Sequence, residues 1–203
     1  MSNCCAPENS ATNPRYRKIL WIALVINIAM FCVELVSGFT AHSVSLLADA
    51  VDFFGDASNY ALSLFVLALA PAWRSKAALL KGATMGAYGI FVLGKAGWNV
   101  TTGSIPEPVT MGMIGLLALA ANGIVALLLF SYRNGDANMR SVWLCTRNDV
   151  LGNIAVILAA IGVFGTGSNW PDIGVAIVMG ILGLTAAWSV IAHARKELRV
   201  TSR

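Results

Sequence analysis

Residues 44–70 read VSLLADAVDFFGDASNYALSLFVLALA, a stretch long enough to cross a membrane as a helix and apolar except for its acids. Spacings of three and four residues place Asp49, Asp52 and Asp56 on one face of that helix. An ionised carboxylate is costly inside a bilayer, so intramembrane acids are rare and usually face a protein-lined interior. This stripe of oxygens predicts a site for a positively charged ligand inside a helical bundle.

The composition places the whole chain in the class of multi-pass membrane proteins. Of its 203 residues, 57% are hydrophobic and only 12% are charged, with a mean hydropathy of +0.71. We therefore predict an all-α membrane protein of six transmembrane helices, each near the roughly 20 residues that a bilayer requires. The expected spans are 19–39, 44–70, 78–102, 109–131, 140–164 and 171–192.

The basic residues predict the orientation of these spans. The connections 41–43, 103–108 and 165–170 contain no Lys or Arg, whereas the tails and the remaining connections are basic. The positive-inside rule then places both termini in the cytoplasm, and we expect the cell's inner membrane as the location. The net charge of +4 does not indicate nucleic acid as a partner, because the basic residues flank apolar spans that meet the lipid bilayer.

The sequence predicts a short tail followed by one membrane domain. Residues 1–14 are expected to form a flexible cytoplasmic tail without a secretory signal, and residues 15–200 to form the six-helix domain. About ten residues follow the last span, so we expect no soluble C-terminal domain. No span carries a nucleophile–base pair or a phosphate-binding loop. The chain is therefore predicted not to be an enzyme, and no prosthetic group is expected.

A second acidic motif lies in the fifth span, where Cys145 and Asp149 are one helical turn apart. At ~1.5 Å per residue, Asp56 lies roughly 18 Å from the outer side and Asp149 roughly 13 Å from the cytoplasmic side. In a core about 30 Å thick these depths nearly coincide. Asp52, Asp56, Cys145 and Asp149 therefore form a candidate tetrahedral site for zinc, cadmium or cobalt.

These motifs resemble the transmembrane domain of the cation diffusion facilitator family of divalent-metal/proton antiporters. The resemblance rests on Ser45-Leu-Leu-Ala-Asp49-Ala-Val-Asp52-Phe-Phe-Gly-Asp56 and on Cys145-Thr-Arg-Asn-Asp149-Val-Leu-Gly-Asn153, and it covers roughly residues 15–200. Glu34, Asn122 and Asp172 also stand where the family places similar residues. The resemblance implies an efflux transporter that works as a homodimer, here through its transmembrane helices. The residues expected along its ion pathway are Glu34, Asp49, Asn122 and Asn153.

The chain departs from the family pattern in three places. Cys145 stands where the family usually has His, which favours a softer ion than zinc. The cytoplasmic domain that usually follows the sixth helix is expected to be absent, because only about ten residues follow the last span. The connection 131–140 contains no His, although this loop is often His-rich in zinc-transporting members.

The candidate site also predicts a mechanism. Three carboxylates and a thiolate carry four negative charges against a divalent ion, so some protons should stay bound when the metal is absent. Metal binding needs deprotonated ligands and releases those protons. Alternate exposure of the site to the two sides would then exchange cytoplasmic metal for external protons.

Other interpretations stay open at this stage. The same acids could bind a small organic cation beside Phe53, Phe54 and Tyr60, or the chain could be a non-transporting metal-binding subunit. The acids could also be structural, paired with Lys95 or Arg147. Asp49 lies nearer the outer mouth and is read as a pathway or packing acid. The adjacent Cys4 and Cys5 of the tail could capture a soft metal ion.

Overall fold

The computed structural model describes residues 14–62, 64, 71–133 and 137–201, and within these ranges the chain is helical with no strand. The prediction of an all-α protein with six helices is confirmed. The helices are α1 (Pro14–Thr40), α2 (Val44–Ala61), α3 (Pro71–Thr102), α4 (Pro108–Phe130), α5 (Ala137–Thr166) and α6 (Trp170–Thr201).

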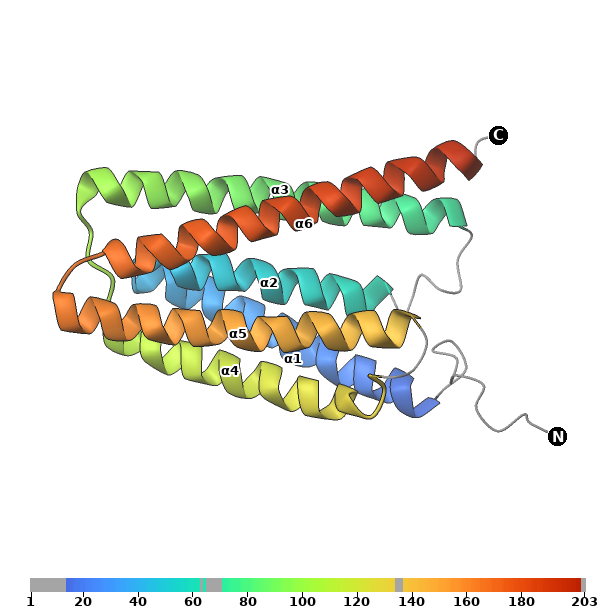
Figure 1. The fold of residues 1–203 in the computed structure, drawn as a ribbon, viewed down its shortest axis with the longest axis horizontal. Coiled ribbons are helices and arrows are strands. Elements are labelled where there is room, and N and C mark those ends of the chain that lie inside the picture. The colour runs from blue at the N-terminus through green and yellow to red at the C-terminus, as the bar shows by residue number, and fades with distance from the viewer. Residues whose placement is uncertain (1–13, 63, 65–70, 134–136, 202–203) are drawn as a thin grey trace.

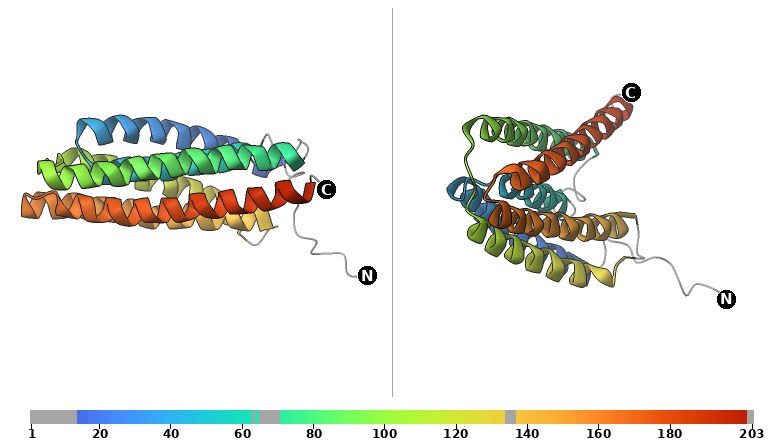
Figure 2. Two further views of the ribbon diagram at one scale, coloured as in Figure 1. Left: turned by 90° about the horizontal axis from the view of Figure 1, so that it is seen from above. Right: turned by 60° about the vertical axis from the view of Figure 1, so that its left-hand side comes forward.

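The helices pack in two layers that are closest at one end of the bundle (Figure 1). α3 packs mainly against α6, while α1 with α2 and α4 with α5 form the second layer. The layers meet at the end that carries the turns α1–α2, α3–α4 and α5–α6, here called the loop end. They diverge toward the terminal end, where both termini lie, as the second view in Figure 2 shows.

α2 is the centre of this arrangement, because it contacts all five other helices. Thirteen of its 18 residues are buried, including two of its three aspartates. The acidic helix is therefore surrounded by protein rather than by lipid, as intramembrane acids require. The last part of the predicted second span, residues 63 and 65–70, lies outside the described residues.

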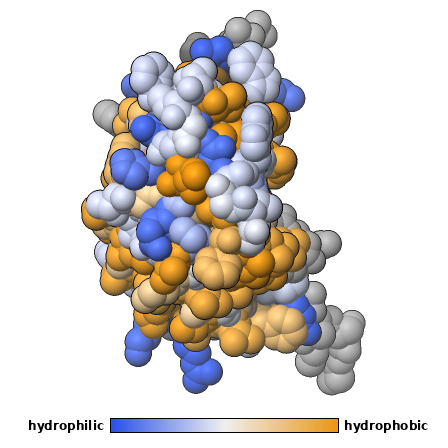
Figure 3. All heavy atoms as spheres, turned by 90° about the vertical axis from the view of Figure 1, so that its left-hand side faces the viewer, coloured by the Kyte–Doolittle hydropathy of each residue, from blue (hydrophilic) through white to orange (hydrophobic). Residues whose placement is uncertain are grey.

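Among the described residues, four helices are long and apolar enough to cross a membrane: α1, α4, residues 149–166 of α5 and residues 170–196 of α6. These helices also expose large apolar side chains to the surroundings, such as Val36, Leu127, Phe164 and Trp188. In a bilayer such side chains contact lipid. The loop end presents a more polar face, with hydrophilic side chains gathered on part of it above a mostly hydrophobic flank (Figure 3).

A buried carboxylate caps the start of α2 from another helix. Asp172 of α6 is fully buried and accepts hydrogen bonds from the backbone N–H groups of Val44 (2.8 Å) and Ser45 (3.0 Å). It also accepts from the hydroxyls of Ser43 (2.7 Å) and Ser45 (2.6 Å). The first N–H groups of a helix have no partner within the helix, and a negative charge there is favourable. Asp172 therefore fastens α6 to the N-terminus of α2.

Further hydrogen bonds join the other segments of the loop end. The Asn169 side chain donates to the Asn99 carbonyl (2.9 Å), and the Asn99 side chain donates to the His42 carbonyl (3.4 Å). The backbone N–H of Glu107 donates to the carbonyl of Ala41 (2.9 Å). His42 adopts a positive φ of 55°, which ends α1 in a tight left-handed turn. All three interhelical connections of this end are thereby linked.

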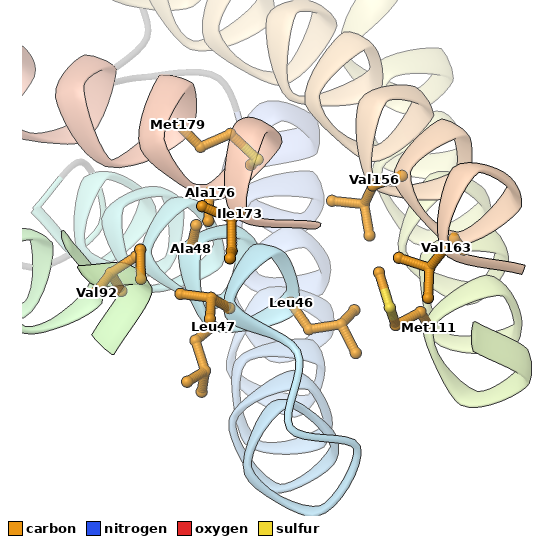
Figure 4. Close-up of a cluster of buried hydrophobic side chains, with 14 of the residues drawn as sticks. Leu46, Leu47, Ala48, Val92, Met111, Val156, Val163, Ile173, Ala176 and Met179 are labelled. Carbon is orange, nitrogen blue, oxygen red and sulfur yellow. The ribbon is translucent and has the colours of Figure 1, made fainter. Parts of the chain in front are cut away.

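Apolar packing reinforces the same end of the bundle (Figure 4). Leu46 points toward Met111 of α4, on the side where Val156 and Val163 of α5 lie, while the neighbouring Leu47 lies on the side of α3. Two adjacent residues of α2 thus fill the two sides of one core. The cluster joins residues from α2, α3, α4, α5 and α6.

Glycines allow α3 and α6 to approach closely, as the glycine-rich third and sixth spans suggest. A Cβ at Gly82 would lie 2.7 Å from Ile191 Cγ1 and 3.2 Å from the Ala187 carbonyl oxygen. A Cβ at Gly180 would lie 2.8 Å from Leu93 Cδ2. These distances are too short for a side chain, so the pair packs backbone against side chain along its length.

Asp172→Ala should destabilise the protein strongly, because it leaves several buried donors without an acceptor. We expect the free energy of unfolding to fall by about 3 kcal/mol, measured by chemical unfolding in detergent micelles. Glu107→Ala is the matched control, since Glu107 caps α4 locally at an exposed position and its loss should cost only about 1 kcal/mol. Equal effects of the two substitutions would contradict the assigned role of Asp172.

The Glu107 cap should also show a characteristic pH dependence. Hydrogen bonds from Thr110, its hydroxyl and its backbone N–H, lower the pKa of Glu107, with a further contribution from the Val109 N–H. A depressed carboxylate pKa gives stability that is present above the unfolded-state pKa and is lost as the pH falls through the folded-state pKa. The cap is therefore fully formed at neutral pH.

Candidate functional site

The three aspartates of α2 lie at successive levels of the bundle interior. Asp49 is 1% exposed and Asp56 is 7% exposed, while Asp52 between them is half-buried. Each interacts electrostatically with its neighbour, because Asp52 faces both Asp49 and Asp56. The stripe expected from the helical spacing is therefore present, but its two ends have different partners.

The end nearer the loops is a hydrogen-bonded acid–amide cluster. The Asn153 side chain of α5 donates to Asp49 Oδ2 (2.8 Å), and its Oδ1 accepts from the Asn122 side chain of α4 (2.9 Å). Glu34 of α1 completes the cluster, since its strongest interaction with a charged group is with Asp49. Four helices thus contribute one residue each. All four residues predicted for the ion pathway come together here.

The end nearer the termini is organised around a tyrosine hydroxyl. Tyr60, one turn after Asp56, donates to Asp56 Oδ2 (3.0 Å) and shares a hydrogen bond with the Thr146 hydroxyl of α5 (2.7 Å). The same hydroxyl interacts electrostatically with Asp149. Asp56 and Asp149 therefore lie around one group, at the level where α2 and α5 meet. Ligation of a metal ion by these two acids stays a prediction.

A glycine allows α5 to approach the acids of α2. A Cβ at Gly152 would lie 3.9 Å from Asp49 Oδ1 and 4.0 Å from Asp52 Oδ2. It would also lie 3.5 Å from the terminal methyl of Met179, which brings a thioether of α6 close to the same place. Each of these distances is an ordinary van der Waals contact, so α5 and α6 pack directly beside the acids of α2 at this position.

The predicted tetrahedral set is only partly described. Within the described residues, no three Asp, Glu, His or Cys side chains lie close enough together to hold a metal ion. The backbone of Cys145 lies in α5, one turn before Asp149, but its side chain lies outside the described residues. Cys4 and Cys5 lie outside them as well. Ligation by Asp52, Asp56, Cys145 and Asp149 therefore stays a prediction.

Sequence reasoning missed several residues that shape the site. Tyr60 was considered only as an aromatic wall, although its position four residues after Asp56 is a signal for a helical hydrogen bond. Thr146 and Gly152 flank Asp149 at i−3 and i+3, and no feature of the sequence alone marks them. The sequence marks Asp172 only by its position at the start of the sixth span. Its role as a cap is seen only when α6 is packed beside the start of α2.

The comparisons with known proteins agree with this arrangement. Residues 20–199 match the cation efflux transmembrane domain. The chain is 27% identical to a cadmium, cobalt and zinc/H(+)-K(+) antiporter of Bacillus velezensis over 192 residues, 86% of this chain and 60% of the relative. It is 26% identical to the metal cation efflux system protein CzcD of Cupriavidus metallidurans, covering 85% and 58%. It is 27% identical to the zinc transporter ZitB of Escherichia coli, covering 90% and 62%.

A bundle of apolar helices around buried acids defines a multi-pass membrane protein. The match over most of the chain is more specific: the protein belongs to the cation efflux family. The resemblance drawn from the two motifs is thereby confirmed. Members of this family move ions and are not enzymes, as predicted for this chain. The chain spans about three-fifths of the length of the relatives that it matches.

Tyr60→Phe should destabilise the protein, because the change removes the hydroxyl that joins Asp56 to Thr146. We expect the free energy of unfolding to fall by about 1–2 kcal/mol, measured by chemical unfolding in micelles. Tyr88→Phe is the matched control. The buried Tyr88 hydroxyl has no hydrogen-bond partner within the described residues, so its removal should be neutral or stabilising. The reverse order of effects would refute the bridging role of Tyr60.

Proposed function

We propose that the chain is a divalent-metal efflux transporter that carries zinc, cadmium, cobalt or a similar soft ion out of the cytoplasm. The observation that carries this proposal is the meeting of Asp56 and Asp149 around the Tyr60 hydroxyl, with Asp52 one turn away. With Cys145, these acids give an oxygen- and sulfur-containing set that suits zinc and its softer neighbours. The names of the relatives support the same group of ions.

Proton exchange follows from the charge of this set. Asp52, Asp56, Cys145 and Asp149 would carry four negative charges when fully deprotonated, twice the charge of the ion. In a low-dielectric interior such an excess keeps protons bound until the metal displaces them. Return of the empty site with protons bound then completes an antiport cycle. The name of the Bacillus velezensis relative, which includes H(+), supports this coupling.

The shape of the bundle supports alternate access to this site. The loop end is closed by Asp172 and by the linked turns, while the two layers diverge toward the termini. With both termini in the cytoplasm of an inner-membrane protein, the closed loop end would be the outer end of the bundle. Exposure to the outside would then require the separation of α6 from the start of α2.

Two further parts of the proposal concern partners. We expect a homodimer formed through transmembrane helices, whose exposed apolar side chains can pack against a second copy as well as against lipid. Cys4 and Cys5 of the tail would capture a soft ion and pass it to the site.

The burial and bonding of the aromatic residues near Asp56 favour a metal ion over a small organic cation as the transported ion. Phe53 is 1% exposed and packs with Met30, Ala118 and Ala121, and Tyr60 is bonded to Asp56 and Thr146. These rings therefore support the core rather than form walls for an organic cation. A non-transporting metal-binding subunit would bind metal without a pH-driven flux, and the next experiment distinguishes it.

Asp56→Asn should abolish metal flux in proteoliposomes, because the change removes one ligand charge while keeping the size of the side chain. Wild-type protein should move zinc or cadmium when a pH step is applied, read with a metal-sensitive dye inside the vesicles. Asp149→Asn should behave like Asp56→Asn, and the exposed Glu107→Gln should transport normally. The absence of pH-driven flux in wild type, or normal flux in Asp56→Asn, would refute the proposal.

Cys145 should set the preference among metals. Cys145→Ala should weaken cadmium binding by about 10- to 100-fold, the range seen when support for a metal site is lost, with a smaller effect on cobalt. Cys145→His should shift the preference toward zinc and cobalt, since imidazole is a harder ligand than thiolate. Isothermal titration of the three metals measures both effects. The same ratio of cadmium to cobalt affinity in all three proteins would show that Cys145 is no ligand.

A further inference from the structure

A carboxyl group of α1 is hydrogen-bonded to one of the aspartates of α2. Glu34 and Asp49 share a side-chain hydrogen bond, and they are 0% and 1% exposed, respectively. A hydrogen bond between two carboxyl groups requires a hydrogen on one of them, because an ionised carboxylate can only accept. The pair therefore holds a proton in this structure, although neither residue belongs to the proposed set of metal ligands.

The packing of α1 against α2 holds this pair together. Gly38 lies one turn after Glu34 on the same face of α1. A Cβ at Gly38 would lie 2.8 Å from the Leu47 side chain and 3.1 Å from the Leu47 backbone nitrogen. The absence of a side chain at Gly38 thus lets α1 approach α2 only two residues before Asp49. The distance between the two acids is therefore set by the helices on which they lie.

The partners of the two acids differ, and the difference assigns the proton. Asp49 Oδ2 accepts a hydrogen bond from the Asn153 amide (2.8 Å), which stabilises the ionised form of Asp49. Among the described residues, Glu34 has no hydrogen-bond partner other than Asp49. The hydrogen is therefore carried by Glu34, whose hydroxyl donates to the Asp49 carboxylate.

The groups around the pair in the described part of the chain offer no positive charge that could replace the proton. The charged groups that act on Glu34 are Asp49 and Asp52, and the uncharged Tyr88 hydroxyl of α3 also faces it. α4, which packs against α1 as well, contains no titratable residue, and α5 contributes the neutral Asn153. A second negative charge on the pair would have no compensating partner, so loss of the proton needs a cation nearby.

We propose that Glu34 and Asp49 form a proton-binding pair, which holds one shared proton while the metal site is empty and releases it to water when a divalent ion binds near Asp52. This inference rests on the proposed metal/proton exchange and adds one proton to those carried by the metal ligands. The charge of the ion takes the place of the proton's charge, after which both carboxyl groups are ionised. Asp52 transmits the effect, because it interacts electrostatically with both acids of the pair.

The number of protons released on zinc binding tests this inference on the full chain in detergent micelles. Isothermal titration of zinc in buffers of different ionisation enthalpy gives that number. Glu34→Gln is the decisive variant, because its amide can still donate to Asp49 but has no proton to release. We expect it to bind zinc while releasing about one proton fewer per ion than wild type. The control Glu107→Gln removes an exposed acid and should release the wild-type number. Equal numbers for Glu34→Gln and wild type would overturn the inference.

Infrared spectroscopy of the metal-free protein gives a second test that does not depend on zinc. A protonated carboxyl group has its own C=O stretching band, which wild type should show at neutral pH and Glu34→Gln should show with reduced intensity. If wild type binds no zinc, the proposed function is refuted, while a weaker band in Glu34→Gln still supports the shared proton. If only Glu34→Gln fails to bind zinc, the same comparison decides. A band of equal intensity in the two proteins overturns the inference in every case.

Discussion

The arrangement of this bundle depends on the carboxylate of Asp172 at the N-terminus of α2. A helix that enters a membrane leaves its first N–H groups without partners inside the helix, and lipid offers none. Asp172 accepts from two of these groups and from two serine hydroxyls, so α6 supplies what α2 lacks. Because α6 also pairs with α3, one interaction joins the two layers at the loop end. The position of every acid on α2 follows from the way that this end is fixed.

A second constraint is the cost of charge inside the membrane. α2 can carry three aspartates because it lies between five other helices, each of which excludes lipid from it. Their partners differ along the helix. The Asn153 amide of α5 donates to Asp49 and is itself held by Asn122 of α4, whereas the hydroxyl of Tyr60 donates to Asp56. Amides and hydroxyls stabilise a carboxylate without neutralising it, so the negative charge remains available to a mobile cation. A lysine or arginine at these positions would have neutralised that charge permanently.

The sequence was sufficient for the six helices, and it predicts a common level for the acids of α2 and α5, because both follow from one-dimensional quantities. The length of apolar runs gives the six helices, and a fixed rise per residue brings Asp56 and Asp149 to similar depths. Contacts between distant segments could not be derived in this way. Asp172 reaches residues that precede it by more than 120 positions. Gly152 matters only because α5 is rotated toward Asp49 and Asp52. Such rotations depend on the packing of whole helices, which single-sequence periodicity does not determine.

The three aspartates of α2 also link the electrostatic potential at one end of the row, near Glu34 and Asp49, to that at the other end, near Asp56. Asp52 interacts with acids on both sides, so a divalent ion near Asp56 lowers the negative potential felt by Glu34 and Asp49. A proton bound at those two residues has the reciprocal effect, because linkage between two sites acts equally in both directions. Two cations of like charge held one or two helical turns apart in a poorly screened interior disfavour each other. If Asp52 and Asp56 hold the metal ion, as proposed, this geometry favours the exchange of metal for protons over the transport of both together.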